Sequence, residues 1–339
     1  LLLRDMGRLP EAANAFAEQY DDPQCRSEAL RLGAFEDLRT HIQATATANT
    51  APVWLEIGDL IKYHVDHPRP SGVQRVIAES VERLLRLRDD IALIVIAEGG
   101  LLQEISPGQV RRLVALTGMD GDVQAYAREV LDHAPYIPAK GEGVVLTFGA
   151  FWTDPGFFEA VDDMRKAGRA LISMIHDLIP LTHPEFAGAG VADQMGPAFQ
   201  RLCKRCDWMI AVSERTRAEM TRLGCQADAC SVVPLCHDFA CKGAAAPRSN
   251  RFADLIGVPG FVLCVGTIEP RKNHELLLRL WRAYQHEGLS PPPLVLAGRE
   301  GWGTNDLVAQ LDEMGAIIRL GPVSDAELAW LYQDCALTV

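Results

Sequence analysis

The chain has 339 residues with 45 acidic and 33 basic side chains, and its formal net charge is −12. This length suits about two domains, and 48% hydrophobic with 23% charged residues is the composition of a folded chain rather than a disordered one. The acidic charge argues against nucleic acid or an anionic membrane as a general partner, although a few local cations can still bind phosphate. No stretch is long and apolar enough to span a membrane, and no signal peptide is visible.

Nine cysteines are spread along the chain, and we expect reduced thiols rather than a disulfide framework. Cys203 and Cys206 have the CxxC spacing of some zinc sites, but no second close pair follows them. We expect a helix over residues 195–207, on which these two thiols are neighbours. Packed thiols are therefore favoured over a zinc site.

Residues 1–50 have a helical pattern. Gly7, Ala12 and Phe16 resemble the second helix of a tetratricopeptide repeat, and a single helical hairpin explains the same residues equally well. Because the first residue is Leu1 rather than Met, we expect the chain to be part of a longer protein.

From residue 51 the pattern changes to apolar strands that alternate with helices, which predicts a first domain over residues 51–241. Continuous apolar strands indicate a parallel sheet covered by helices on both faces. A helix is expected over residues 72–88, after a long loop. The strands are expected at residues 53–57, 91–96, 143–148, 170–175, 208–212 and 230–234.

Residues 242–258 are predicted to be a linker, and the same alternation begins again over residues 259–339. A complete doubly wound domain has five or six strands, so we expect this second domain to be incomplete at Val339. The predicted fold is α/β, with two Rossmann-like domains that face each other across a cleft and bind ligands at the carboxyl ends of their strands. The expected strands are 261–265, 294–296, 316–320 and 336–339, and the helices are 273–285, 306–314 and 325–333.

Gly72 opens the first helix of the first domain. A glycine at a helix N-terminus lets backbone N–H groups approach a phosphate, and the helix dipole favours the negative charge. The alternative is an ordinary helix start that Ser71 caps.

His176 and Asp177 follow a buried strand directly. A histidine at this position can contact a substrate hydroxyl or transfer a proton, and the alternative is a hydrogen-bonded histidine beside an Asp turn. Because ligands bind at strand ends in such folds, we favour the functional interpretation.

Arg271 and Lys272 lie between the first strand and the first helix of the second domain. Adjacent cations at a helix start oppose the helix dipole unless an anion binds there, and a diphosphate would remove the conflict. A glycine-rich loop at residues 297–303 is explained as well by a turn as by a ligand contact. Ser213 is expected to cap a helix.

Four short motifs follow one another along the chain, and they are informative when taken together. Ser-Gly-Val-Gln-Arg-Val, His-Asp-Leu-Ile-Pro, Ala-Val-Ser-Glu-Arg-Thr and Val-Gly-Thr-Ile-Glu-Pro-Arg-Lys-Asn-His together resemble the retaining GT-B glycosyltransferases of family 4. The resemblance covers about residues 54–339 and is nearest to bacterial mannosyl- and rhamnosyltransferases of surface-polysaccharide assembly.

The resemblance implies a role for each matching residue. His176, Arg271 and Lys272 would be catalytic: the histidine contacts the transferred sugar, and the two cations hold the diphosphate leaving group. The family requires no metal or other cofactor and no protein nucleophile, because the leaving phosphate takes the proton of the acceptor. The residues that would bind the donor nucleotide sugar are Gly72, Gly266, Thr267, Arg271, Lys272 and Val323.

The chain departs from the family in two respects. Thr267 stands where many members carry arginine, and the family's pair of donor-site glutamates would follow Val339. The resemblance implies transfer of a hexose, mannose or rhamnose, from a nucleotide sugar to a glycan or lipid-linked acceptor. It also implies a cytoplasmic location, with room for peripheral contact with the membrane. The alternatives are a nucleotide-sugar epimerase of the same fold and a non-catalytic module that binds sugar nucleotides.

Overall fold

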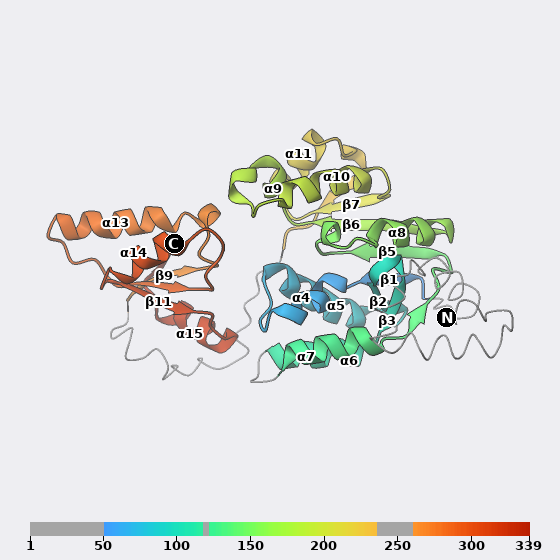
Figure 1. Ribbon diagram of the computed structural model, residues 1–339, viewed down its shortest axis with the longest axis horizontal. Helices are drawn as coiled ribbons and strands as arrows, with labels where there is room; N and C mark the ends of the chain where they lie inside the picture. The colour runs from blue at the N-terminus through green and yellow to red at the C-terminus, as the bar shows by residue number, and fades with distance from the viewer. Residues whose placement is uncertain (1–50, 118–121, 236–259) are drawn as a thin grey trace, which may run out of the picture. The chain divides into compact units, whose positions relative to one another are not determined.

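The computed structural model describes residues 51–117, 122–235 and 260–339 (Figure 1). The chain divides into two compact units, Leu1–Leu235 and Cys236–Val339, which are described separately below. The helical segment expected over residues 1–50 and the linker expected over residues 242–258 lie outside the described residues, so the domain boundaries remain predictions.

The first unit is built on one eight-stranded sheet with the order β4-β3-β2-β1-β5-β6-β7-β8. The six strands predicted from sequence are present and pair in parallel. Two short strands that the sequence pattern did not indicate, β3 and β4, extend the β2 edge in antiparallel pairing. The strands are β1 (Val53–Glu56), β2 (Ile91–Ile96), β3 (Leu102–Ile105), β4 (Tyr136–Ile137), β5 (Gly143–Thr147), β6 (Arg169–Ile175), β7 (Trp208–Ala211) and β8 (Cys230–Val232).

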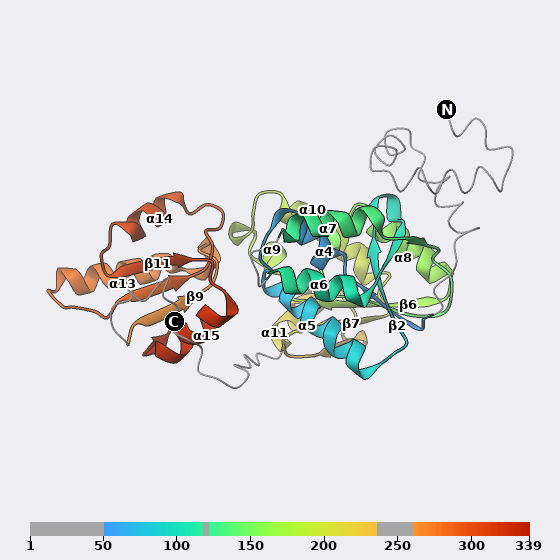
Figure 2. The same ribbon diagram turned by 90° about the horizontal axis from the view of Figure 1, so that it is seen from below.

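Helices cover both faces of this sheet (Figures 1 and 2). Successive residues of a strand point to opposite faces, so Trp54 packs with the core beneath α8 and α10, and Leu55 packs with the core beneath α4 to α7. The helices are α4 (Gly58–Asp66), α5 (Gly72–Leu87), α6 (Pro107–Thr117), α7 (Val123–His133), α8 (Phe157–Lys166), α9 (Ile179–Thr182), α10 (Val191–Cys203) and α11 (Glu214–Arg222).

The prediction of a long loop between the first strand and α5 was wrong, because part of this segment forms helix α4. Leu60, Ile61 and His64 are buried on one face of this helix, and the first two pack against the sheet. The spacing of these residues is helical, but the helix is short and contains several polar residues, so its pattern is weak.

The prediction that the cysteines are reduced thiols was wrong for two of them. Cys203 and Cys225 form a disulfide, and they were expected to be reduced. Cys203 ends α10, and Gly224 adopts a left-handed φ of 100° directly before Cys225, which brings the two Cα atoms to 5.3 Å. This separation lies within the range that a disulfide bridges. Cys206 lies beyond the end of α10 and is a free thiol, so it is not the helical neighbour of Cys203 that we expected.

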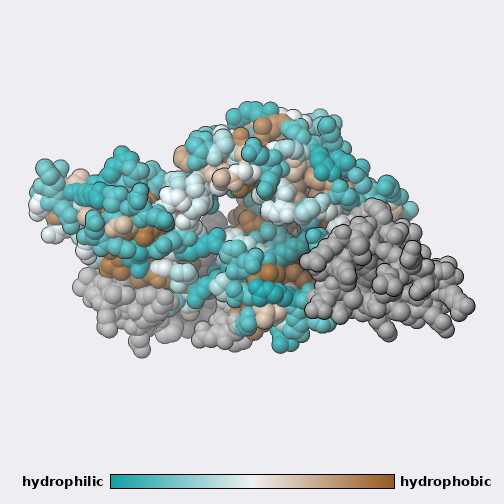
Figure 3. All heavy atoms as spheres, in the orientation of Figure 1, coloured by the Kyte–Doolittle hydropathy of each residue, from teal (hydrophilic) through white to brown (hydrophobic). Residues whose placement is uncertain are grey.

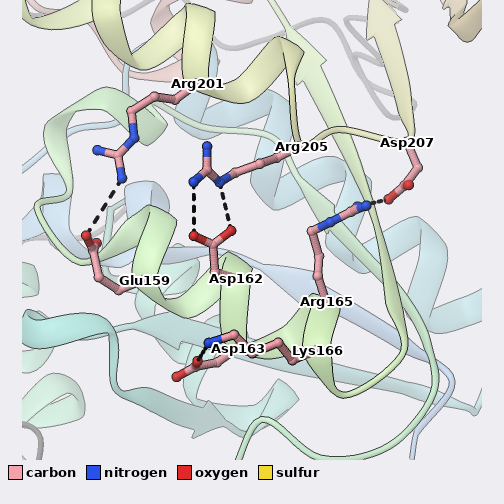
Figure 4. A network of polar contacts seen from close by, with 8 residues as sticks. All are labelled: Glu159, Asp162, Asp163, Arg165, Lys166, Arg201, Arg205 and Asp207. Carbon is pink, nitrogen blue, oxygen red and sulfur yellow. Dashed lines mark hydrogen bonds and ion pairs between the residues drawn. The ribbon is translucent and has the colours of Figure 1, made fainter.

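An ionic network joins α8 to α10 and to the start of β7 (Figure 4). Arg205 forms two hydrogen bonds with Asp162, at 2.7 and 3.0 Å, and its guanidinium also lies over the ring of Phe158. Arg201 lies over the same ring at 4.1 Å. The network holds α8 against α10, and its other ion pairs are Arg201–Glu159, Arg165–Asp207 and Lys166–Asp163.

The second unit contains a parallel sheet of four strands with the order β11-β10-β9-β12. Helices α13 and α14 pack on one core, and α15 packs on the other. The predicted elements are all present, with small shifts at their ends. They are β9 (Val262–Val265), β10 (Leu294–Ala297), β11 (Ile317–Gly321), β12 (Leu337–Thr338), α13 (His274–His286), α14 (Asn305–Asp312) and α15 (Asp325–Asp334).

The surface is largely hydrophilic on the face drawn in Figure 3, where hydrophobic residues form small separate patches. Among the residues that the structure describes, no helix has the length and apolar character needed to cross a membrane.

Candidate active site

His176 lies directly after β6, at the carboxyl edge of the first sheet. Its Nε2 atom is 2.8 Å from the carbonyl oxygen of Phe148. A carbonyl oxygen only accepts hydrogen bonds, so Nε2 is the donor, and in a neutral imidazole Nδ1 then keeps a free lone pair. Thr216 donates a hydrogen bond of 3.2 Å to the backbone oxygen of His176. The hydrogen bond to Phe148 thus orients the ring, and the ring keeps one nitrogen that can accept a hydroxyl hydrogen.

Asp177 has a structural role in the next turn. Its carboxylate accepts a hydrogen bond of 3.1 Å from the backbone N–H of Ile179, at the start of α9. Ser213 caps α11 by accepting a hydrogen bond of 3.0 Å from the N–H of Thr216, as predicted.

Gly72 is the first residue of α5. Ser71 is the N-cap residue, as expected, and the side-chain oxygen of Gln74 accepts a hydrogen bond of 3.3 Å from the backbone N–H of this serine in a capping box. A Cβ atom at Gly72 would meet nothing within 4 Å. The packing of this unit therefore does not explain a glycine at this position, and its contact with a phosphate remains a prediction.

Asp59 is a site residue that the sequence analysis missed. Its carboxylate accepts a hydrogen bond of 3.2 Å from the N–H of Ala150, after β5, and also forms a side-chain hydrogen bond with Gln74. It interacts electrostatically with His176, and burial raises its pKa, an effect that these three partners oppose. Asp59 thus joins the first turn of α5 to the residues that follow β5 and β6. The sequence did contain a signal for Asp59, since this acidic residue comes shortly after the first buried strand.

Glu56 ends β1 and is almost fully buried. Burial raises the pKa of its carboxyl to about 7, while Lys62 and the N–H of Gly58, which donates a hydrogen bond of 2.7 Å, favour the charged form. The ammonium of Lys62 donates to the backbone oxygen of Ile96 and to Asp154. Three acids, Glu56, Asp59 and Asp154, therefore surround one lysine at this edge of the sheet.

In the second unit, Arg271 and Lys272 belong to a single 3-10 turn between β9 and α13. Asn273 then adopts the left-handed conformation (φ 54°), which Asn tolerates better than most residues, and α13 begins at His274. Arg271 pairs with Glu269 at 2.6 Å. Within the described part of the chain, the ammonium of Lys272 has no ion-pair partner and is exposed, so its charge is available to a ligand.

The loops that follow β9, β10 and β11 are in direct contact. Gly266 donates a hydrogen bond of 3.0 Å to Ala297, and Gly298 donates one of 3.0 Å to Gly321. A Cβ atom at Gly298 would lie 1.9 Å from the backbone oxygen of Gly266, so only glycine permits this approach. The contacts bring together the loops that carry Gly266, Thr267 and Val323.

The described residues contain no group of three or more His, Cys, Asp or Glu side chains that could hold a metal ion. Each unit thus carries its own candidate group: His176 with Asp59 in the first unit, and the cationic turn with its neighbouring loops in the second.

Comparison with known sequences places this chain in a family. Residues 70–240 match the sequence model of Glycosyltransferase Family 4, and the chain belongs to this family. It is 25% identical over 215 residues to the serotype-specific mannosyltransferase WbdA of Escherichia coli, a match over 58% of this chain and 26% of WbdA. It is 30% identical over 174 residues to the O-antigen chain mannosyltransferase B of Escherichia coli, over 48% of this chain and 44% of that protein. The matches thus span less than half the length of these relatives.

Solved structures support the fold. The crystal structure of Anabaena Alr3699/HepE in complex with UDP and glucose aligns with a TM-score of 0.52 at 15% identity, over 84% of this chain and 72% of that chain. The complex of the same protein with UDP-glucose aligns with a TM-score of 0.51 at 16% identity. Together with the two Rossmann-like units, these likenesses confirm the predicted GT-B fold class. The placement of the two domains across a cleft remains a prediction.

Proposed function

We propose that this protein is a retaining hexosyltransferase that moves mannose, or the related sugar rhamnose, from a nucleotide-diphosphate sugar to a glycan or lipid-linked acceptor of a surface polysaccharide. The observation that carries this proposal is the cationic turn before α13, where the charge of Arg271 is partly balanced by Glu269 and that of Lys272 is available. Family membership supports the reaction class, and the two mannosyltransferases among the relatives support mannose as the first sugar to test.

Each site residue has a proposed task. Lys272 and Arg271 bind the diphosphate and stabilise its charge as it leaves, so the reaction proceeds without a metal ion. His176 accepts a hydrogen bond from a sugar hydroxyl through its free Nδ1 atom. Gly72 contacts the donor phosphate, and Gly266, Thr267 and Val323 contact the nucleotide. In a retaining reaction of this kind, the leaving phosphate oxygen takes the acceptor's proton and no protein nucleophile is needed.

The experiment is a donor screen with the full-length protein. GDP-mannose and other nucleotide sugars are incubated with and without an O-antigen-type oligosaccharide, and nucleotide release and product mass are measured. The proposal expects acceptor-dependent release from GDP-mannose, an α-linked product by NMR, and unchanged rates in EDTA. Binding without release would indicate a non-catalytic module, and conversion of the donor sugar without transfer would indicate an epimerase. Either outcome would contradict the proposal.

We also propose a cytoplasmic location, which allows peripheral contact with the inner face of the membrane. Cell fractionation tests it, and recovery of the protein outside the cytoplasm would contradict it.

A further inference from the structure

Asp59 packs against the turn that follows β5. A Cβ atom at Gly149 would lie 2.2 Å from the Cβ of Asp59 and 2.8 Å from its Oδ2 atom, so only glycine allows this approach. The same Oδ2 atom accepts the hydrogen bond of 3.2 Å from Ala150, across 91 residues of sequence. The half-buried carboxylate therefore holds the backbone on the C-terminal side of Gly149.

The backbone on the other side of Gly149 holds His176. The carbonyl oxygen of Phe148 accepts the hydrogen bond from Nε2 of His176 at 2.8 Å. Asp59 and His176 thus bind opposite ends of one three-residue turn. The carbonyl of Phe148 and the N–H of Ala150 belong to the two peptide planes that meet at the Cα of Gly149, so the two hydrogen bonds together fix the backbone dihedral angles of this glycine.

The position of Asp59 is itself well determined. It forms a side-chain hydrogen bond with Gln74, in the first turn of α5, and Gln74 is almost fully buried. The carboxylate also interacts electrostatically with His176. Asp59 is therefore held in place and is linked to the histidine through the turn.

We propose that Asp59 is a positioning residue that holds the Phe148–Ala150 turn, and thereby keeps His176 in the tautomer with hydrogen on Nε2 and its Nδ1 atom free to accept a hydrogen bond. The idea that Nδ1 accepts a hydrogen bond from a sugar hydroxyl rests on the proposed function. The tautomer of His176 does not depend on that function, so the tautomer and the sugar contact can be tested separately.

The first measurement is ¹⁵N NMR of the protein labelled at its nine histidines, with His176→Gln to assign the signal. For the neutral ring of the wild type, we expect hydrogen on Nε2 and none on Nδ1. A wild-type His176 with hydrogen on Nδ1 would overturn the proposal without any variant.

The second measurement compares substitutions of Asp59. Asp59→Ala removes the acceptor of the Ala150 N–H, so we expect a mixture of His176 tautomers and a kcat about 10- to 100-fold lower, with little change in KM for the donor. Asp59→Asn keeps an oxygen acceptor and should restore the wild-type tautomer and most of kcat. Asp66→Ala, an exposed acid at the end of the same helix, is the matched control.

The outcomes separate the possible roles. If Asp59→Ala only lowers the melting temperature while the tautomer and kcat stay as in the wild type, Asp59 is merely structural and the proposal fails. If the wild type transfers no sugar but the variants change the tautomer as expected, the proposed function fails and the positioning role stands.

Discussion

Lys62 and Asp154 form an ion pair at 2.5 Å between side chains that are 92 residues apart in the sequence. Lys62 lies on α4, and Asp154 lies in the turn before α8. The same ammonium donates to the backbone oxygen of Ile96 at the end of β2. One lysine therefore joins three segments at the carboxyl edge of the sheet, next to Glu56 and Asp59.

Lys62→Met should lower the free energy of unfolding by about 1–3 kcal/mol, because it leaves the largely buried carboxylate of Asp154 without its ion-pair partner. Chemical denaturation at pH 7 measures the effect. Lys166→Met is the matched control, since the Lys166 side chain is 76% exposed, and it should change stability by less than about 0.5 kcal/mol. Equal effects of the two variants would mean that the Lys62 pair contributes no more than a surface ion pair.

Glu56 should make stability depend on pH. Its pKa is raised from 4.5 to about 7 on folding, so the folded state binds the proton more tightly than the unfolded state does. The resulting stabilisation is complete below pH 4.5 and is lost as the pH rises to about 7, which amounts to roughly 3 kcal/mol. Glu56→Gln removes this titration, so its stability should fall less than that of the wild type between pH 4.5 and pH 8. Parallel curves for the two proteins would contradict the burial of an ionisable Glu56.

His176→Ala should lower turnover far more than nucleotide binding, because the proposed contact is with the sugar rather than with the nucleotide. Steady-state kinetics and calorimetry with the nucleoside diphosphate measure the two effects. His133→Ala, at the C-terminal end of α7, is the control and should leave both unchanged. Equal losses of turnover and binding would indicate a structural histidine.

Lys272→Ala should weaken the binding of a nucleoside diphosphate by about 1.5–3 kcal/mol, the usual effect of losing a charge-assisted hydrogen bond. Arg271→Ala should cost less, because Glu269 already balances part of the arginine charge. Arg279→Ala, an exposed cation on α13 in the same unit, is the matched control for titration calorimetry. An unchanged affinity of the Lys272 variant would remove this residue from the donor site.

Gly298→Ala should disturb the donor loops, because its Cβ would lie 1.9 Å from the backbone oxygen of Gly266. We expect lower stability of the second unit and weaker nucleotide binding. Gly315→Ala is the control, since a Cβ at Gly315 meets nothing within 4 Å. Thermal unfolding and calorimetry compare the two variants, and equal behaviour would show that the Gly266–Gly298 approach is not needed.

Much of the fold could be predicted because its signals are local. The run Ile91–Ile96 is apolar at every position and is a strand, and the period of Val73, Ile77, Val81 and Leu84 indicates the helix α5. Ser213 as a helix cap could also be predicted, since a cap bonds to residues two or three positions further on. Helix α4 was missed because it is short and partly polar, and β3 and β4 because their pairing depends on other strands.

The sequence by itself determined the alternation of strands and helices, the family, the position of His176 at the end of a strand, and the position of Arg271 and Lys272 between a strand and a helix. These features depend on hydrophobic period and on neighbouring residues. Only the tertiary structure decided that Asp59 holds the turn beside His176, that Lys62 pairs with Asp154, and that Cys203 bonds with Cys225. Each of these contacts joins residues that are far apart in the chain, and a single sequence contains no local pattern that specifies such a partner.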